Sequence, residues 1–322
     1  MSNDFSPLPV RVFPAEGESG LGFVLRASSR NGVPMKTLLK SAGASKSRWI
    51  KPTAIPVLAR ITEVASEWLR HHFIIARPDN GHQLSEWHGA LWSFPLSLRG
   101  MRAQYCGACL RQFGRCHAAW ELGAAFVCLE HRAMLRDRCP HCGRIVSWAR
   151  PAIDVCACGR YLTAQSPQPE AAAWQLQWTA TVLAGTTDIP CSQMQGSELP
   201  PCLQSLSPDG LLAVVFAFGV RESAGANVSG TEAVVSPAPD VTACIVERGL
   251  RRLRSLRPFE TSCPPALRDV VYVEGLERLA RRGASDADRA IAVSLRDWLR
   301  GVPKAGYSTV GRRVRGQLDL FR

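Results

Sequence analysis

Apolar residues near the start of the chain recur at helical spacing, and they predict a helix over residues 18–29. The pair Asn31-Gly32 follows, and these two residue types suit a turn that needs positive φ angles. Pro34 can then occupy the first position of a second short helix, where its missing N–H is no loss. A helix, a tight glycine turn and a second helix are the outline of a helix-turn-helix.

Similar patterns continue along the chain. Residues 55–71 are expected to form one longer helix that completes the core of an amino-terminal domain, and residues 170–184 to form another. Residues 209–221 are almost entirely apolar, which is typical of a buried helix in a second domain. Helical spacing resumes at Val241. No apolar run approaches the roughly 20 residues that a membrane span needs, so a cytosolic protein is expected.

A second helix-turn-helix candidate lies in the carboxyl-terminal part. Residues 274–281 and 286–299 predict two helices, and Gly283 supplies the turn between them. An ordinary helical hairpin with a solvated charged face is the alternative interpretation of both candidates.

The distribution of charge favours a polyanionic partner. The 322 residues carry a formal net charge of +12, and their 46% hydrophobic content fits two or three domains with buried cores. Basic residues are in excess by 6 in residues 1–105, by 4 in residues 106–165 and by 8 in residues 241–322, whereas residues 166–240 have a net charge of −6. Nucleic acid is the commonest partner for such a basic excess.

Many of these basic residues fall on or beside the predicted helices, where a DNA-binding helix-turn-helix requires them. The candidate DNA-contacting residues are Arg26, Arg30, Lys36, Lys40, Lys46, Arg48, Lys51, Arg251, Arg252, Arg289, Arg296 and Arg300.

Cysteine spacing gives the strongest signal in the sequence. Twelve cysteines without a secretory signal favour metal ligation over disulfides, because cytosolic thiols are kept reduced. Eight ligands form four close pairs, namely Cys106 and Cys109, Cys128 and His131, Cys139 and Cys142, and Cys156 and Cys158. Two such pairs complete the tetrahedral shell of one structural zinc ion, so the spacing predicts two ions.

Several pairings of these ligands are compatible with the spacing. Sequential pairing needs only local loops, so we expect the first two pairs to bind one ion and the last two pairs the other. A cross-braced arrangement of alternate pairs is an alternative, as is a substitution by Cys116 or His117. A redox motif or an iron–sulfur cluster would not explain the histidine in the second pair.

No pattern indicates catalysis. The sequence has no phosphate-cradling Gly-x-x-x-x-Gly-Lys, no His-Glu-x-x-His and no Gly-x-Ser-x-Gly motif. Four protein ligands leave a zinc ion without an open position for water, and we expect no enzyme activity. His71 and His72 are expected to be surface or capping residues.

These patterns predict a mainly α fold with a tandem zinc-ribbon or zinc-finger middle region. The expected divisions are an amino-terminal helix-turn-helix domain (residues 1–104), a tandem zinc-binding region (105–165), a linker that leads into helical structure (166–240) and a basic helical domain (241–322).

Two stretches resemble a known family. The first is Pro9-Val-Arg-Val-Phe-Pro-Ala-Glu-Gly-Glu-Ser, and the second runs from Tyr105 to Gly143, with three of the four ligand pairs and Trp120 between them. Over residues 8–162 the chain resembles the TniQ family of transposition proteins. This resemblance implies an amino-terminal helix-turn-helix domain joined to tandem zinc-binding motifs.

The resemblance also implies a function and partners. Family members help to select the target site together with an AAA+ ATPase regulator and a transposase; some bind attachment-site DNA, and others dock as dimers on RNA-guided complexes of the CRISPR type. We therefore expect a cytoplasmic bacterial accessory protein of a mobile genetic element, which binds DNA, recruits these partners, or does both. The alternative is a protein adaptor that docks on a targeting complex without touching DNA.

Overall fold

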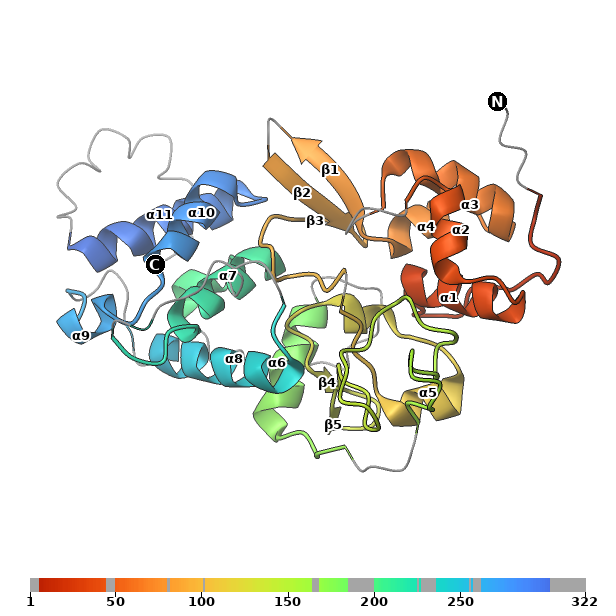
Figure 1. Ribbon diagram of the computed structural model, residues 1–322. Coiled ribbons are helices and arrows are strands. Elements are labelled where there is room, and N and C mark those ends of the chain that lie inside the picture. Colours follow the sequence, from red (N-terminus) through yellow and green to blue (C-terminus); the bar gives the residue numbers. More distant parts are fainter. Residues whose placement is uncertain are drawn as a thin grey trace. The chain divides into compact units, whose positions relative to one another are not determined.

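The chain is represented by a computed structural model. It describes residues 6–44, 50–79, 82–100, 102–163, 168–184, 200–224, 226, 236–254, 256 and 262–301. Helices predominate among these residues, with two small sheets (Figure 1). The chain divides into two compact units. Unit 1 comprises Met1–Gln195 and Val234–Ala243, and unit 2 comprises Gly196–Ala233 and Cys244–Arg322. None of the described helices is both long and apolar enough to cross a membrane.

Unit 1 begins with a group of short helices. They are α1 (Gly20–Arg30), α2 (Met35–Ser41), η1 (Pro52–Ala54), α3 (Ile55–Thr62) and α4 (Ser66–His72). Ser19 caps α1, because its Oγ accepts a hydrogen bond of 2.8 Å from the backbone N–H of Gly22. The turn after α1 contains Asn31 and Gly32, and Pro34 precedes α2. The two predicted helices and the turn between them are therefore present.

The prediction of a single helix over residues 55–71 is wrong. Glu63 has a φ of 55° and ends α3 in the left-handed region, and Ala65 is extended before α4 begins. This break redirects the chain so that Ile61 of α3 and Leu69 of α4 both enter the core. Periodicity alone did not reveal it, because the apolar spacing continues across the break.

A three-stranded antiparallel sheet follows, which was not predicted from the sequence. Its strands are β1 (Ile75–Asp79), β2 (His82–Trp87) and β3 (Ala90–Trp92), in the order β1-β2-β3. His88 and Gly89 connect β2 to β3 with φ angles of 48° and 73°. Two consecutive positive φ angles are those of a tight hairpin turn whose twist matches the strands.

The middle of unit 1 has little regular structure. It contains α5 (Gly107–Phe113), η2 (Ala118–Glu121), β4 (Val127–Cys128) and β5 (Ala133–Met134), and α6 (Ala173–Ala184) packs on β4. One cluster of buried apolar residues extends from Val12 to Leu162. The first four helices and the middle region therefore share a single core.

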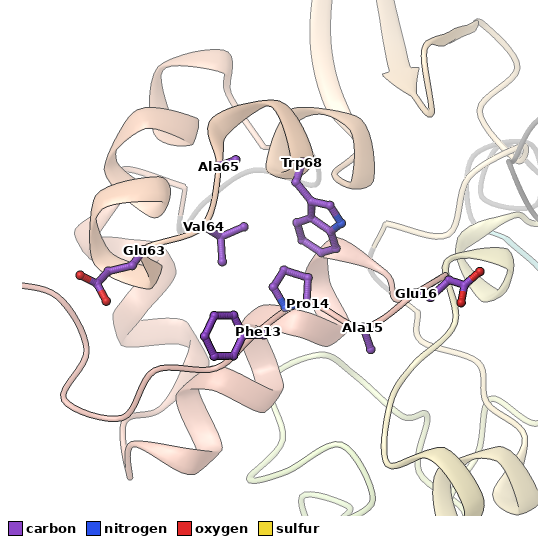
Figure 2. A pocket seen from close by; sticks show the side chains of 8 residues that line it. All are labelled: Phe13, Pro14, Ala15, Glu16, Glu63, Val64, Ala65 and Trp68. Atoms are coloured by element: carbon purple, nitrogen blue, oxygen red, sulfur yellow. The ribbon is translucent and has the colours of Figure 1, made fainter.

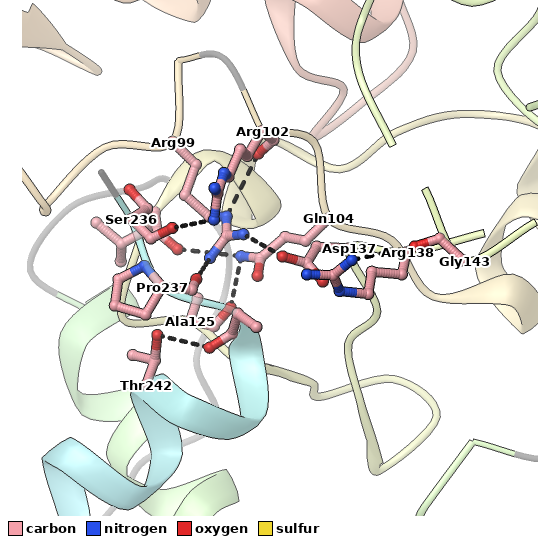
Figure 3. Close-up of polar contacts among 12 residues, drawn as sticks. Arg99, Arg102, Gln104, Ala125, Asp137, Arg138, Gly143, Ser236, Pro237 and Thr242 are labelled. Atoms are coloured by element: carbon pink, nitrogen blue, oxygen red, sulfur yellow. Dashed lines mark hydrogen bonds and ion pairs between the residues drawn. The ribbon is translucent and has the colours of Figure 1, made fainter. Parts of the chain in front are cut away.

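Two arginines attach residues 236–237 to this middle region (Figure 3). The fully buried guanidinium of Arg99 forms an ion pair of 3.2 Å with Asp137 and donates a hydrogen bond of 2.7 Å to the carbonyl of Pro237. Arg102 donates one of 3.1 Å to the carbonyl of Ser236. Burial lowers the pKa of Arg99 to about 10, so it stays charged at neutral pH and depends on these partners.

Unit 2 is built around one buried helix. Its elements are η3 (Pro201–Leu203), α7 (Pro208–Gly219), α9 (Pro265–Arg268), α10 (Val273–Arg282), α11 (Asp286–Arg300) and most of α8 (Pro239–Arg254). Nearly every residue of α7 is buried, as its apolar sequence predicted, and α10 and α11 pack against it. The buried carboxylate of Asp288 accepts hydrogen bonds from the backbone N–H and the hydroxyl of Ser207.

Glycine makes the close approach of α7 and α8 feasible. A Cβ atom on Gly219 would lie 2.0 Å from the carbonyl oxygen of Ile245, and one on Gly249 would lie 2.2 Å from that of Val215. Both contacts are with backbone atoms, which cannot move aside without shifting a helix. The helices are therefore in direct backbone contact at this crossing.

This crossing can be tested with Gly249→Ala. Alanine normally stabilises a helix by about 1 kcal/mol relative to glycine. Here we expect the opposite sign: the free energy of unfolding should fall by about 1–3 kcal/mol, because the added methyl group overpacks the crossing. Thermal unfolding measures the effect. Gly275→Ala in α10 is the control, since its nearest neighbour is the ring of Tyr272, and an equal or smaller loss in Gly249→Ala would contradict the close crossing.

Candidate metal centres

The first predicted ligand set converges in the structure. Cys106, Cys109, Cys128 and His131 offer ligand atoms that all lie within 4.8 Å of one another. The Sγ atoms of Cys109 and Cys128 are 3.5 Å apart, and the Nδ1 atom of His131 lies 3.2 Å from Cys109 Sγ. The three cysteines are buried and His131 is partly buried. This group joins the start of α5 to the turn that connects β4 and β5.

A neighbouring side chain orients the histidine of this first group. Nε2 of His131 lies 2.9 Å from Oε1 of Gln112 in α5. An amide oxygen accepts a hydrogen bond from a protonated Nε2, which leaves Nδ1 free as a ligand. Such a partner on the second ring nitrogen is typical of metal-binding histidines. Gln112 was not predicted from the sequence, because only the helix α5 brings it to the ring.

The second set converges in the same way. The ligand atoms of Cys139, Cys142, Cys156 and Cys158 lie within 4.8 Å of one another. Sγ of Cys139 is 3.8 Å from that of Cys158, and Sγ of Cys142 is 3.9 Å from that of Cys156. The tight pair Cys156-x-Cys158 therefore brings both of its thiols to the group.

Both sets fit a tetrahedral metal ion. Each gathers four ligand atoms from two turns, and the donor sets Cys₃His and Cys₄ are those of structural zinc sites. A backbone hydrogen bond from Arg144 lowers the pKa of Cys142 to about 6, toward the thiolate form that zinc binds. The grouping follows the sequential order of the pairs. Among the described residues, no other set of three or more such side chains converges.

Cys116 and His117, which the sequence offered as alternative metal ligands, belong to neither group. Cys116 is fully buried, burial raises its pKa to about 11, and its sulfur accepts a hydrogen bond of 3.5 Å from Arg150. Burial lowers the pKa of His117 to about 4, and its ring packs between Phe113 and Trp120. Both residues contribute to the core next to the first group.

Arg150 organises the loop between the two halves of the second group. Its buried guanidinium donates hydrogen bonds to the carbonyls of Ser147 (2.9 Å), Ala152 (3.2 Å) and Ile153 (3.1 Å), in addition to Cys116. Carbonyl dipoles therefore compensate its charge. Arg150 was not predicted from the sequence, because its burial, which it shares with Arg99, depends on the fold.

Three histidines form a second cluster of titratable side chains. The rings of His71 and His72 at the end of α4 lie 4.5 Å and 5.0 Å from the ring of His88 in the β2–β3 turn. Burial, then the proximity of His72 and His71, lowers the pKa of His88 to about 3. The ring of His72 also stacks on Trp68, at 4.1 Å. His88 therefore packs as an uncharged aromatic ring at neutral pH, and the three histidines are not a convergent metal set.

A buried carboxyl group lies close to the start of α1. Oε2 of Glu121 accepts a hydrogen bond of 3.0 Å from Nε1 of Trp87, and no described group donates to Oε1. Burial raises the pKa of Glu121 to about 8, although the bond from Trp87 opposes this shift. Glu121 therefore enters the folded protein in its neutral form.

A small groove opens at the break between α3 and α4. Residues 13–16 and 63–65 line it together with Trp68, and its volume is about 390 Å³ (Figure 2). The ring of Phe13 on one wall is 66% exposed. The lining offers two carboxylates but no nucleophile and no convergent metal ligands.

A comparison with family models now identifies this part of the chain. The model described as TniQ matches residues 9–135. The chain carries a TniQ domain. The match covers α1 to α4, the three-stranded sheet and all four ligands of the first metal group, whereas the ligands of the second group lie beyond it. No curated protein matches the chain.

The basic residues predicted on the TniQ domain have different surroundings. Arg26 is engaged, because it forms an ion pair of 2.6 Å with the buried carboxylate of Glu18. The remaining described members are exposed, and no described carboxylate pairs with them; they are Arg30, Lys36, Lys40 and Lys51. Lys46 and Arg48 lie outside the described residues.

The predicted basic residues of unit 2 are mostly engaged within the protein. Arg289 pairs with Asp286, Arg296 with Asp297 at 2.7 Å, and Arg300 with Glu277. Arg252 donates to four backbone carbonyls, those of Phe218, Arg221, Glu222 and Val270. Arg251 is exposed. These contacts use much of the hydrogen-bonding capacity that DNA binding would require.

The metal groups can be tested by single substitutions. Cys109→Ser and Cys142→Ser should each remove one of two zinc ions, because each deletes one thiolate from a separate group. Elemental analysis of the purified protein measures the metal content. Cys116→Ser is the matched control and should keep both ions. Retention of two zinc ions in Cys109→Ser, or their loss in Cys116→Ser, would show that the ligands are grouped differently.

Glu121 gives a pH dependence of stability. Its pKa is raised in the folded state, so the stability it contributes is complete at low pH and is lost as the pH rises towards about 8. We expect the free energy of unfolding to fall by up to about 1.4 kcal/mol per pH unit between pH 6.5 and 8. Glu121→Gln should reduce this slope, as measured by denaturant unfolding. An unchanged slope in the variant would contradict the assignment.

Proposed function

We propose that this chain is a non-enzymatic accessory protein of DNA transposition. In this proposal it acts in the bacterial cytoplasm, helps to select the target site by binding DNA, and recruits an AAA+ ATPase regulator and a transposase. The observation that carries the proposal is the TniQ domain over residues 9–135.

Two bound zinc ions are part of this proposal. Cys₃His and Cys₄ shells with four protein ligands stabilise structure and leave no position for a reacting water. The ions would hold the middle region, which has few helices and strands of its own, as a rigid part of unit 1.

The surface around α2 supports direct contact with DNA. Lys36 and Lys40 are one helical turn apart on α2, and Arg30 ends α1 on the other side of the turn. All three side chains are exposed and lack a carboxylate partner among the described residues. Free cations on a helix and turn can neutralise phosphates and displace their counterions.

Salt dependence tests DNA binding. The purified protein should bind duplex DNA, and its affinity should fall by about 100-fold between roughly 50 and 200 mM salt if it makes about four phosphate contacts. Lys36→Ala/Lys40→Ala should weaken binding about tenfold. Its plot of log affinity against log salt should be shallower by about 2, because two phosphate contacts are lost. Fluorescence anisotropy with a labelled duplex gives both quantities.

The matched control is Arg60→Gln/Arg70→Gln. It removes the same charge from exposed positions on α3 and α4 that lack described carboxylate partners. Affinity lost equally in both double variants would indicate a general charge effect. Failure of the intact protein to bind DNA would overturn the DNA-binding part of the proposal.

A protein adaptor is the second candidate, and the internal contacts of Arg252, Arg289, Arg296 and Arg300 favour it for unit 2. Arginines that are already paired contribute less to DNA affinity. An adaptor would capture its ATPase partner equally well before and after nuclease treatment, whereas a DNA-dependent complex would be lost.

A further inference from the structure

We propose that the surface around the second metal group is a further DNA-contacting surface, which binds the phosphate backbone. We call this surface the ribbon tip, and it consists of Arg138, His141, Arg144, Arg160 and Tyr161. The inference rests on the proposed function in DNA transposition. It adds a contact surface outside the helix-turn-helix candidates and beyond the residues matched by the TniQ model.

The second metal group places two arginines in equivalent positions. The sequence Cys-Gly-Arg occurs twice, as residues 142–144 and residues 158–160. Gly143 and Gly159 have φ angles of 68° and 81°, so both turns bend in the left-handed region. The carbonyl of Arg144 accepts from the N–H of Cys139, and the carbonyl of Arg160 accepts from that of Cys156, both at 2.9 Å. The two turns therefore present one arginine each beside the same four thiols.

The three arginines of the ribbon tip and its histidine face solvent. Arg138, His141, Arg144 and Arg160 are all exposed. Residues 138–163 contain only one acidic residue, Asp154. No described carboxylate forms an ion pair with these arginines, in contrast to the arginines of α11. Their charge is therefore available to a partner.

One competing role for these arginines is neutralisation of the metal group. Four thiolates and one divalent ion leave a net charge of −2, and Arg144 donates a hydrogen bond to Cys142. Arg138 instead donates to the carbonyl of Gly143, at 3.1 Å, and no contact to another described side chain is found for Arg160. Neutralisation therefore does not account for Arg138 and Arg160, and Arg144 keeps further N–H donors beyond its single bond to Cys142.

An exposed aromatic ring beside these cations points to nucleic acid as the partner. The side chain of Tyr161 is 61% exposed, although most aromatic residues of unit 1 are buried. Its backbone pairs with Val155, which fixes it next to Arg160. Arginines bind phosphates and an adjacent aromatic ring packs on sugars or bases, a combination that recurs in nucleic-acid interfaces.

The test compares Arg144→Gln/Arg160→Gln with the control Arg60→Gln/Arg70→Gln on the same labelled duplex DNA. We expect the ribbon-tip variant to bind several-fold more weakly and its plot of log affinity against log salt to be shallower by about 2, because two phosphate contacts are lost. Zinc analysis should still give two ions. If the double variant loses zinc, Arg160→Gln alone, which leaves the contact with Cys142 intact, should make the slope shallower by about 1.

Tyr161→Ala provides an independent measurement. It should weaken binding without changing the salt slope, because the ring carries no charge. The inference is overturned if the zinc-replete arginine variants bind DNA with the affinity and slope of the control. If the unmodified protein nevertheless binds DNA and Lys36→Ala/Lys40→Ala weakens that binding, the proposed function stands without the ribbon tip. If the unmodified protein does not bind DNA at all, both this inference and the proposed DNA binding are refuted.

Discussion

The middle of unit 1 depends on two groups of side chains, each of which brings four ligand atoms together at one point. Residues 106–163 contain one seven-residue helix, a short 3-10 turn and two strands of two residues. Such a segment has little regular helix or sheet with which to define a fold. The two ligand groups close its loops instead, and buried side chains of the same segment then join the core formed by the first helices.

Sequence spacing anticipated much of this architecture. A ligand pair separated by one or two residues is a local geometric requirement, so the eight side chains that converge were identifiable without knowledge of the rest of the chain. Most helices were equally accessible, since apolar residues at helical spacing and a cap such as Ser19 are local signals. The apolar segment that became α7 was correctly expected to be buried.

Features that depend on tertiary contacts were not accessible in this way. The left-handed residue Glu63 is not a typical helix terminator, and the short strands β1 to β3 lack a clear alternation of apolar and polar residues. Arg26, Arg289 and Arg300 look like free cations in the sequence, yet each has a carboxylate partner in the structure. Charge counting therefore overestimates how much of the basic surface is free to contact a partner.

The three backbone carbonyls that accept hydrogen bonds from Arg150, which we call the carbonyl cage, have a consequence for assembly of the second metal group. The cage folds residues 147–153, which lie between Cys142 and Cys156, without using a ligand. Because this loop is already ordered, bringing the four ligands together around an ion costs less chain entropy. A peptide of residues 139–158 would contain these carbonyls but lack the contact between Arg150 and Cys116, and it should bind metal more weakly than the intact chain. Lysine could not substitute for Arg150, because one ammonium group cannot span the separate directions of these acceptors.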